Sequence, residues 1–137
     1  MPAIDNCQPQ VINGVRKEGW RIDKAPLFAR LDSFIDILAL RSKTNNGSLE
    51  QIIVVEVKCF DDRVGFLDDL YRSIGQYLVY RKILRTRTSE VPIYLALPNT
   101  AYHTISQMRV ILDVIHEIDM KLLVVNLDTE EIETWIG

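Results

Sequence analysis

The sequence predicts an α/β protein in which a mixed sheet is flanked by helices. Segments rich in β-branched residues, typical of strands, alternate along the chain with segments whose apolar residues recur at helical spacing. Two neighbouring strand-like segments are separated by a polar loop with an Asn-Gly pair, which predicts a hairpin within the sheet. At 137 residues the chain fits one domain, residues 1–137.

The first part of the chain predicts one short helix and three strands. In residues 6–18 apolar and polar side chains alternate at helical spacing and Gly19 follows, which favours an amphipathic helix that ends at a glycine. Residues 20–23 form a brief strand before a proline. Residues 33–40, "SFIDILAL", and 52–60, "IIVVEVKCF", are the two strands of the expected hairpin.

The second part predicts two helices and three strands. A long helix over 63–85 carries an apolar stripe on one side, and residues 101–118 form a second helix. Residues 91–98 form a strand closed by a proline, and residues 121–127 and 131–136 are two strands joined by the turn "DTEE". The stripe of the long helix consists of Leu70, Ile74, Tyr77 and Leu84.

The composition is that of an ordinary globular protein, with 47% apolar and 26% charged residues and a net charge of −3. No apolar run approaches the roughly 18 residues of a membrane span, and no signal-peptide pattern precedes the first helix. We therefore expect a cytoplasmic protein without a membrane segment. Cys7 and Cys59 lie far apart and outside any CxxC arrangement, so we expect two reduced thiols.

Charge is distributed unevenly along the chain. Arg81, Lys82, Arg85 and Arg87 follow one another without an intervening acid, whereas the chain beyond residue 112 is strongly acidic. The basic run predicts contacts with nucleic-acid phosphates through Arg81, Lys82 and Arg85, and its alternative interpretation is a solvated helix face.

Three charged residues are embedded in the apolar hairpin strands: Asp36 in "FIDIL", and Glu56 and Lys58 in "VVEVK". Residues two apart on a strand share a face, so Glu56 and Lys58 point the same way. An ordinary buried ion pair is one interpretation. The other is a pair of carboxylates, which repel each other unless a cation lies between them; such hard oxygen ligands suit Mg²⁺ or Mn²⁺.

The second interpretation predicts phosphodiester hydrolysis. A divalent ion held by Asp36 and Glu56 would stabilise the leaving oxygen and lower the pKa of a bound water. Lys58, beside the ion, would orient or deprotonate that water, or stabilise the charge that develops on the phosphate.

The hairpin register decides whether the two acids share a face. A two-residue Asn46-Gly47 turn would place Asp36 opposite Val57, on the wrong face. A three-residue loop that includes Asn45 would place Asp36 opposite Glu56. The sequence leaves both registers open.

The helix after the hairpin adds Gln76 and Tyr80, which are four residues apart and lie on one flank with Asp69 and Ser73. The amide and the hydroxyl could tether the carboxylate-bearing strand or contact a nucleotide, or they could be a surface Gln and a half-buried Tyr. Gly75 in mid-helix predicts close approach of another backbone.

Asp36 with Glu56-x-Lys58, in an α-β-β-β-α-β order, resembles the PD-(D/E)XK nuclease superfamily. Gln76-x-x-x-Tyr80 resembles the QxxxY element of its RecB-like and Holliday-junction-resolvase-like branches. The chain is most similar to the XisH-type fdxN element excision controlling factors of cyanobacteria. This similarity rests on "MPAID", "KEGWRI", "VVEVKCF", "GQYLVYR", "YLALP" and "ETWI".

The resemblance implies a restriction-endonuclease-like αβββαβ core with two extra C-terminal strands. It further implies a metal at Asp36 and Glu56, Lys58 as the catalytic lysine, Gln76 and Tyr80 as further site residues, and a small partner of the XisI type. The chain departs from the family pattern at Leu40, where relatives carry a further acid, and at Ile35, where the superfamily name has proline. A metal-binding role on the first helix is not carried over to Glu18.

Two functions follow as hypotheses. The first is a Mg²⁺-dependent endonuclease that acts on DNA in programmed element excision together with the partner. The alternative is a catalytically inactive, nuclease-fold regulatory subunit that binds a protein partner. Three charges kept in a buried sheet favour the first, and the small number of basic residues favours the second. The oligomeric state, including a homo-oligomer, is left open.

Overall fold

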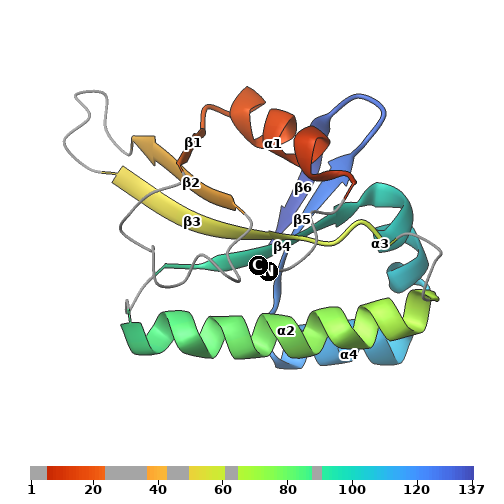
Figure 1. Ribbon diagram of the computed structural model, residues 1–137. Coiled ribbons are helices and arrows are strands. Elements are labelled where there is room, and N and C mark those ends of the chain that lie inside the picture. Colours follow the sequence, from red (N-terminus) through yellow and green to blue (C-terminus); the bar gives the residue numbers. More distant parts are fainter. Residues whose placement is uncertain (1–5, 24–36, 43–49, 61–64, 88–90) are drawn as a thin grey trace.

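A six-stranded mixed sheet with strand order β1-β2-β3-β4-β5-β6 carries the fold (Figure 1). The computed structural model describes residues 6–23, 37–42, 50–60, 65–87 and 91–137. The elements are α1 (Gln8–Lys17), β1 (Arg21–Asp23), β2 (Ile37–Ser42), β3 (Glu50–Val57), α2 (Phe66–Arg87), β4 (Ile93–Pro98), α3 (Asn99–Ser106), α4 (Arg109–Glu117), β5 (Lys121–Asn126) and β6 (Glu131–Ile136). The predicted α/β class with a mixed sheet flanked by helices is confirmed.

The sheet is antiparallel at both edges and parallel in the middle. β1, β2 and β3 pair antiparallel, and β5 pairs antiparallel with β6. β3, β4 and β5 run parallel, and α2 connects the first two of these strands. The carboxyl ends of β3 and β4 therefore meet at one end of the sheet, which is where open α/β sheets place their ligand sites.

Helices cover both faces of the sheet. On one face α1 packs against residues such as Val55, Val57 and Leu123. On the other face α2, α3 and α4 pack against residues such as Val54 and Leu95. Figure 1 shows α1 on one side of the strands and α2 with α4 on the other. Among the described helices, none combines the length and the apolar character needed to cross a membrane.

Polar contacts fasten α1 to the turn between β5 and β6. The Asn13 amide donates to a Glu130 carboxylate oxygen at 2.7 Å, and the Lys17 ammonium donates to the Thr129 carbonyl at 2.8 Å. At the end of the helix, the indole nitrogen of Trp135 donates to Glu18 Oε1 at 2.8 Å. Glu18 therefore holds β6 rather than contributing to the hairpin site.

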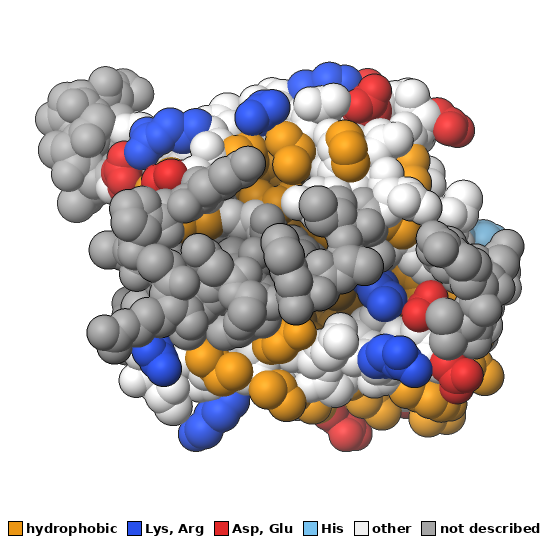
Figure 2. Space-filling view, viewed as in Figure 1, with side chains coloured by type: hydrophobic (Ala, Val, Ile, Leu, Met, Phe, Trp, Pro, Cys, Tyr) orange, Lys and Arg blue, Asp and Glu red, His pale blue; other side chains and the backbone are white. Residues whose placement is uncertain are grey.

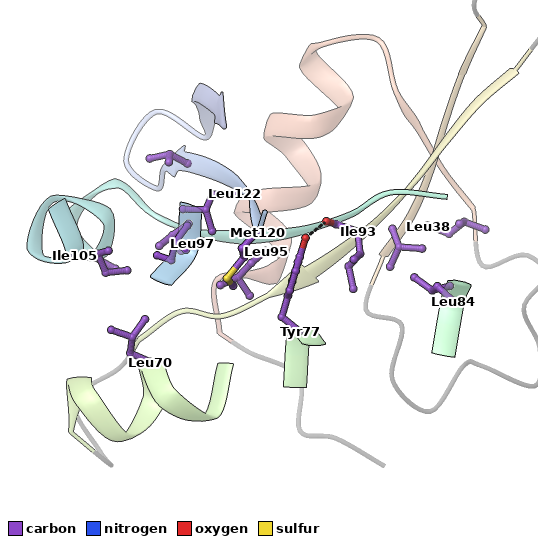
Figure 3. Packing of buried hydrophobic residues seen from close by; sticks show 14 of the residues in the cluster. Leu38, Leu70, Tyr77, Leu84, Ile93, Leu95, Leu97, Ile105, Met120 and Leu122 are labelled. Atoms are coloured by element: carbon purple, nitrogen blue, oxygen red, sulfur yellow. Dashed lines mark hydrogen bonds between the residues drawn. The ribbon is translucent and has the colours of Figure 1, made fainter. Parts of the chain in front are cut away.

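Helix α2 contacts the sheet through the predicted stripe, with Leu70, Tyr77 and Leu84 buried (Figure 3). The Tyr77 hydroxyl donates to the Ile93 carbonyl at 2.9 Å and accepts from the Lys121 backbone N–H at 3.0 Å. Burial raises the pKa of Tyr77, so the folded state keeps this phenol protonated where an unfolded tyrosine begins to ionise. The folded state consequently loses stability as the pH rises above about 10.

We expect Tyr77→Phe to lower the free energy of unfolding by about 1–3 kcal/mol, because the buried Ile93 carbonyl and the partly buried Lys121 N–H lose their partner. Urea unfolding at neutral pH measures the change. Tyr71→Phe is the matched control, since that ring is 57% exposed, and it should shift stability by less than about 0.5 kcal/mol. Equal stability of the two variants would contradict the bridging role of Tyr77.

Two expectations differ from the structure. The single helix predicted for residues 101–118 is two helices, α3 and α4, separated at Gln107 and Met108. The hydroxyls of Thr104 and Ser106 bond to carbonyls of the preceding turn, a contact that competes with helix continuation. The close approach predicted at Gly75 is wrong for the described part of this chain, where no heavy atom outside the helix's own backbone lies within 4 Å of a Cβ placed there.

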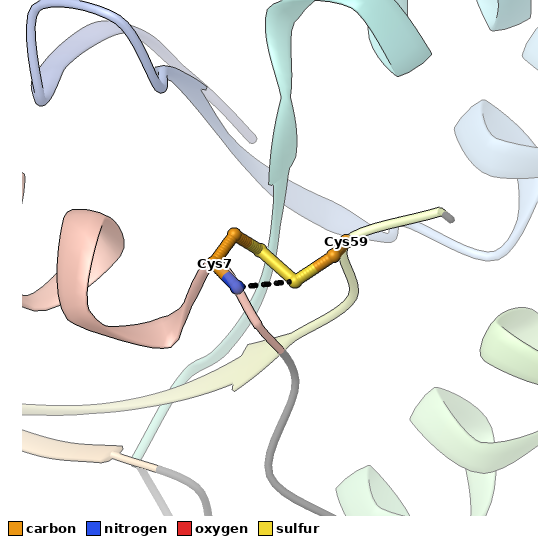
Figure 4. The surroundings of a disulfide bond; sticks show 2 residues. All are labelled: Cys7 and Cys59. Atoms are coloured by element: carbon orange, nitrogen blue, oxygen red, sulfur yellow. Dashed lines mark hydrogen bonds between the residues drawn. A yellow bond between two sulfur atoms is a disulfide. The ribbon is translucent and has the colours of Figure 1, made fainter. Parts of the chain in front are cut away.

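The expectation of two reduced thiols is also wrong, because Cys7 and Cys59 form a disulfide (Figure 4). Their Cα atoms lie 5.8 Å apart, and the backbone N–H of Cys7 donates to the Cys59 sulfur at 3.0 Å. The bond ties the residue before α1 to the segment that follows β3. A sequence separation of 52 concealed this proximity, which arises because α1 crosses the sheet face beside the end of β3.

Candidate active site

The hairpin has the register that a shared carboxylate site requires. Ile37 lies opposite Val55 and Ser42 lies opposite Glu50. These pairs have the register expected for the three-residue turn. In that register position 36 would pair with position 56. Residues 43–49, which carry the predicted turn, lie outside the described residues, and so does Asp36.

Glu56 and Lys58 lie at the carboxyl end of β3, on the face covered by α2. Side chains alternate along the strand: Val55 and Val57 pack on the α1 side, and Val54 packs on the α2 side. Beyond the last strand residue, the Lys58 backbone N–H donates to the Ala96 carbonyl of β4 at 2.9 Å. This bond extends the parallel pairing and fixes the direction of Lys58, so the predicted common face of Glu56 and Lys58 is confirmed.

The polar atoms of this pair lie at a partly covered position. Glu56 is half-buried, and its Oε2 atom is shielded from solvent. The Lys58 side chain is 22% exposed. A carboxylate at such a position needs compensation by a cation or by hydrogen bonds.

Asp69, in the first turns of α2, is the partner of Lys58. Its Oδ1 lies 3.5 Å from Lys58 Nζ, and its side chain is only 7% exposed. Ser73, one turn later, is also buried and donates its hydroxyl to the Asp69 carbonyl at 2.6 Å. The pair therefore links the end of β3 to the start of α2 and holds the ammonium group on the site face.

Sequence reasoning placed Asp69 on the right flank of the helix but gave it no role. Acids in the first turn of a helix are usually explained by their interaction with the helix dipole. This explanation applies equally to exposed Asp68 and buried Asp69, so it does not distinguish them. The useful signal was the shared flank with Ser73, since a buried polar flank on an amphipathic helix needs polar partners on the facing strand.

The described residues supply only part of a metal site. Glu56 offers the hard oxygen ligand that Mg²⁺ prefers. Within the described ranges, no three His, Cys, Asp or Glu side chains form a group able to hold a metal ion. The second predicted ligand, Asp36, lies outside those ranges, so the two-carboxylate site stays a prediction that the register permits.

Gln76 and Tyr80 lie on α2 and differ in surroundings. Gln76 is exposed. Tyr80 is half-buried and packs against the core beneath α2. The structure describes no hydrogen bond from Gln76 to another described residue, so a role for this side chain depends on a bound ligand.

The three predicted phosphate contacts also differ. One guanidinium nitrogen of Arg81 donates to the carbonyls of Ile118 and Asp119 at 2.6 and 3.2 Å, at the end of α4. Arg81 therefore joins α2 to α4. Lys82 and Arg85 are exposed and remain available to a phosphate backbone.

The candidate site is thus the end of strand β3, which carries an acid and a lysine and lies under the first turns of α2 in a mixed α/β sheet. The sequence matches the family described as XisH protein over residues 1–133. The chain belongs to the XisH family, and the resemblance to this family is confirmed.

Two solved structures share the whole fold. An XisH family protein from Nostoc punctiforme PCC 73102 is 30% identical with a TM-score of 0.80, covering 97% of this chain and 100% of that one. An fdxN element excision controlling factor protein from Anabaena variabilis is 29% identical with a TM-score of 0.77 and the same coverage. No curated protein matches the chain.

Proposed function

We propose that this protein is an fdxN-type excision controlling factor that cleaves DNA as a metal-dependent endonuclease of the PD-(D/E)XK type. The observation that carries the proposal is the common face of Glu56 and Lys58 at the end of β3, next to a strand in the register that the site requires. The name of the Anabaena relative supports a role in element excision. A small partner of the XisI type is part of the proposal.

Asp36 and Glu56 would hold Mg²⁺ or Mn²⁺, which supplies Lewis-acid stabilisation and an activated water when bound. Hydrolysis adds one water across a P–O bond: the water oxygen joins phosphorus, and a proton ends on the leaving oxygen. Of the roles open to Lys58, the contact with Asp69 favours charge stabilisation, because it orients the side chain as a cation on the site face.

DNA would approach the carboxyl end of β3 and the exposed side of α2. Gln76 is exposed there and has the hydrogen-bonding groups to contact a base or a phosphate. Lys82 and Arg85 would contact the phosphate backbone further along the helix. Tyr80 would support the site from the core side of α2.

The alternative is a regulatory subunit that keeps the fold without the chemistry and binds a protein partner. One observation favours it: Arg81 is engaged with the end of α4, which removes one of the few candidate phosphate contacts from a chain of net charge −3. The two functions differ in whether a metal ion binds near Glu56.

Metal titration separates them. Mg²⁺ or Mn²⁺ at about ten times its Kd should raise the Tm of the wild type by about 4–7 °C. Glu56→Gln should abolish this rise and leave the Tm without metal unchanged or higher, because an acid is removed from an acidic site. The same samples are assayed for cleavage of linear and branched DNA, with and without the partner protein.

Glu131→Gln is the matched control, because Glu131 is an exposed acid on β6, outside the site. It should retain the metal response of the wild type. If neither ion changes the Tm at millimolar concentration, even with DNA present, the endonuclease proposal fails and the regulatory function stands.

A further inference from the structure

Helix α2 carries apolar side chains on its outer side as well as on the side that packs on the sheet. Leu67, Tyr71, Leu78 and Val79, here called the outer stripe, are 46%, 57%, 36% and 56% exposed. Leu67, Tyr71 and Leu78, spaced by four and seven residues, lie in one row along the helix, and Val79 lies in the neighbouring row, four residues after Gly75. Figure 2 shows hydrophobic side chains gathered along the lower edge of the molecule, where Figure 1 places α2.

Gly75 lies within the outer stripe. It is exposed, and a Cβ added there would meet no heavy atom of the described residues within 4 Å apart from the backbone of its own helix. A mid-helix glycine lowers helix stability, and the packing of this chain does not require one at this position. Because Gly75 has no side chain, the helix surface between Tyr71 and Leu78 is indented. A second helix could approach closely at this point.

The exposed charged residues at the two ends of α2 differ in sign. Asp68 lies in the first turn, exposed Arg72 follows one turn later, and Lys82, Arg85 and Arg87 lie at the carboxyl end, so the acid of the first turn and the bases of the last turns have opposite sign. A second α2 lying antiparallel would bring acid against base at both ends of the contact. A parallel arrangement would bring like charges together.

We propose that two copies of this chain form a two-fold dimer through antiparallel packing of their outer stripes. With Gly75 close to the axis, Tyr71 packs on Leu78 of the second copy, and Leu67 lies along the aliphatic part of Lys82. Because the dimer is two-fold symmetric, each of these contacts occurs twice in the interface. Asp69 and Lys58 lie on the sheet side of α2, so the contact leaves the end of β3 open. It engages Lys82 and Arg85, so DNA that binds through these two residues competes with the dimer.

The contact is small. A helix of 22 residues is about 33 Å long and, with side chains, about 10 Å wide. This footprint, about 330 Å² on each copy, is smaller than that of stable specific interfaces, so we expect a weak dimer that dissociates in the upper micromolar range.

Sedimentation velocity of the wild type from about 1 to 500 μM should show a monomer–dimer equilibrium. Leu78→Glu should raise the dissociation constant at least about tenfold. Val110→Glu is the matched control: Val110, on α4, is 74% exposed, and this substitution should leave the equilibrium unchanged. Circular dichroism confirms that both variants are folded.

Charge exchange tests the orientation. Asp68→Arg and Arg85→Asp should each weaken the dimer severalfold, and the double variant should restore the wild-type dissociation constant. Gly75→Cys should form a disulfide-linked dimer under mild oxidation, and Val110→Cys should not. A wild type that stays monomeric throughout, as it would if the stripe served a different partner, overturns the proposal. So does a dimer that Leu78→Glu leaves intact, or a double variant that does not recover.

Discussion

Replacing Lys58 by Met should lower the proposed metal-dependent DNA cleavage by about 10²–10³-fold. The loss corresponds to removing one preorganised group that stabilises charge in the transition state. The ammonium lies at the carboxyl end of β3, fixed by the backbone bond to Ala96 and by the contact with Asp69. Single-turnover cleavage at saturating protein measures the effect on the chemical step itself.

The same substitution should also lower the free energy of unfolding by about 1–3 kcal/mol. It leaves the Asp69 carboxylate, 7% exposed, without its cation, and partial exposure of Lys58 keeps the cost below that of a fully buried pair. Lys58→Met with Asp69→Leu should recover most of this stability, since both charges are then replaced by apolar groups. Cleavage should stay lost in the double variant.

Recovery of folding without recovery of cleavage distinguishes a catalytic lysine from a structural one. Lys82→Met is the charge-matched control: Lys82 is exposed on α2, so its loss should weaken DNA affinity and the proposed dimer but leave the chemical step at saturating protein unchanged. If Lys58→Met cleaves at the wild-type rate, or if the double variant regains cleavage, Lys58 acts through stability alone.

The sequence was sufficient to predict those parts of the site that depend on strand geometry. Alternation along β3 placed Glu56 and Lys58 on one face without any knowledge of the rest of the chain. The register could not be chosen, because turn length alone decides it and both turns fit the Asn-Gly signal. Asp69 was missed because its burial depends on how α2 docks on β3, a tertiary arrangement without a local signal.

The fold was predictable for similar reasons. Strong apolar segments with clear breakers located all six strands of the described chain, and β6 has the predicted limits, residues 131–136. The split between α3 and α4 was missed because side-chain hydroxyls at Thr104 and Ser106 decide it, and apolar periodicity continues across the break. Gly75 was misread because a mid-helix glycine can face another backbone or an open surface, and periodicity does not distinguish the two.

Reduction of the Cys7–Cys59 disulfide should lower the free energy of unfolding by about 2–4 kcal/mol. The bond closes a loop with a sequence separation of 52, and a crosslink of that span removes much of the entropy of the unfolded chain. Urea unfolding with and without a thiol reductant measures the difference. The double variant Cys7→Ser/Cys59→Ser should have the lower stability and should no longer respond to the reductant.

The effect on the candidate site should be much smaller than the effect on stability. Cys59 directly follows Lys58, but alternation along the chain directs the sulfur to the α1 side and the ammonium to the α2 side. Reduced protein that is still folded should therefore bind metal with nearly the same affinity as the oxidised protein. Metal binding lost on reduction at a temperature where both forms are folded would mean that α1 and the disulfide position the end of β3. Titration of two free thiols in protein never exposed to reductant would contradict the disulfide itself.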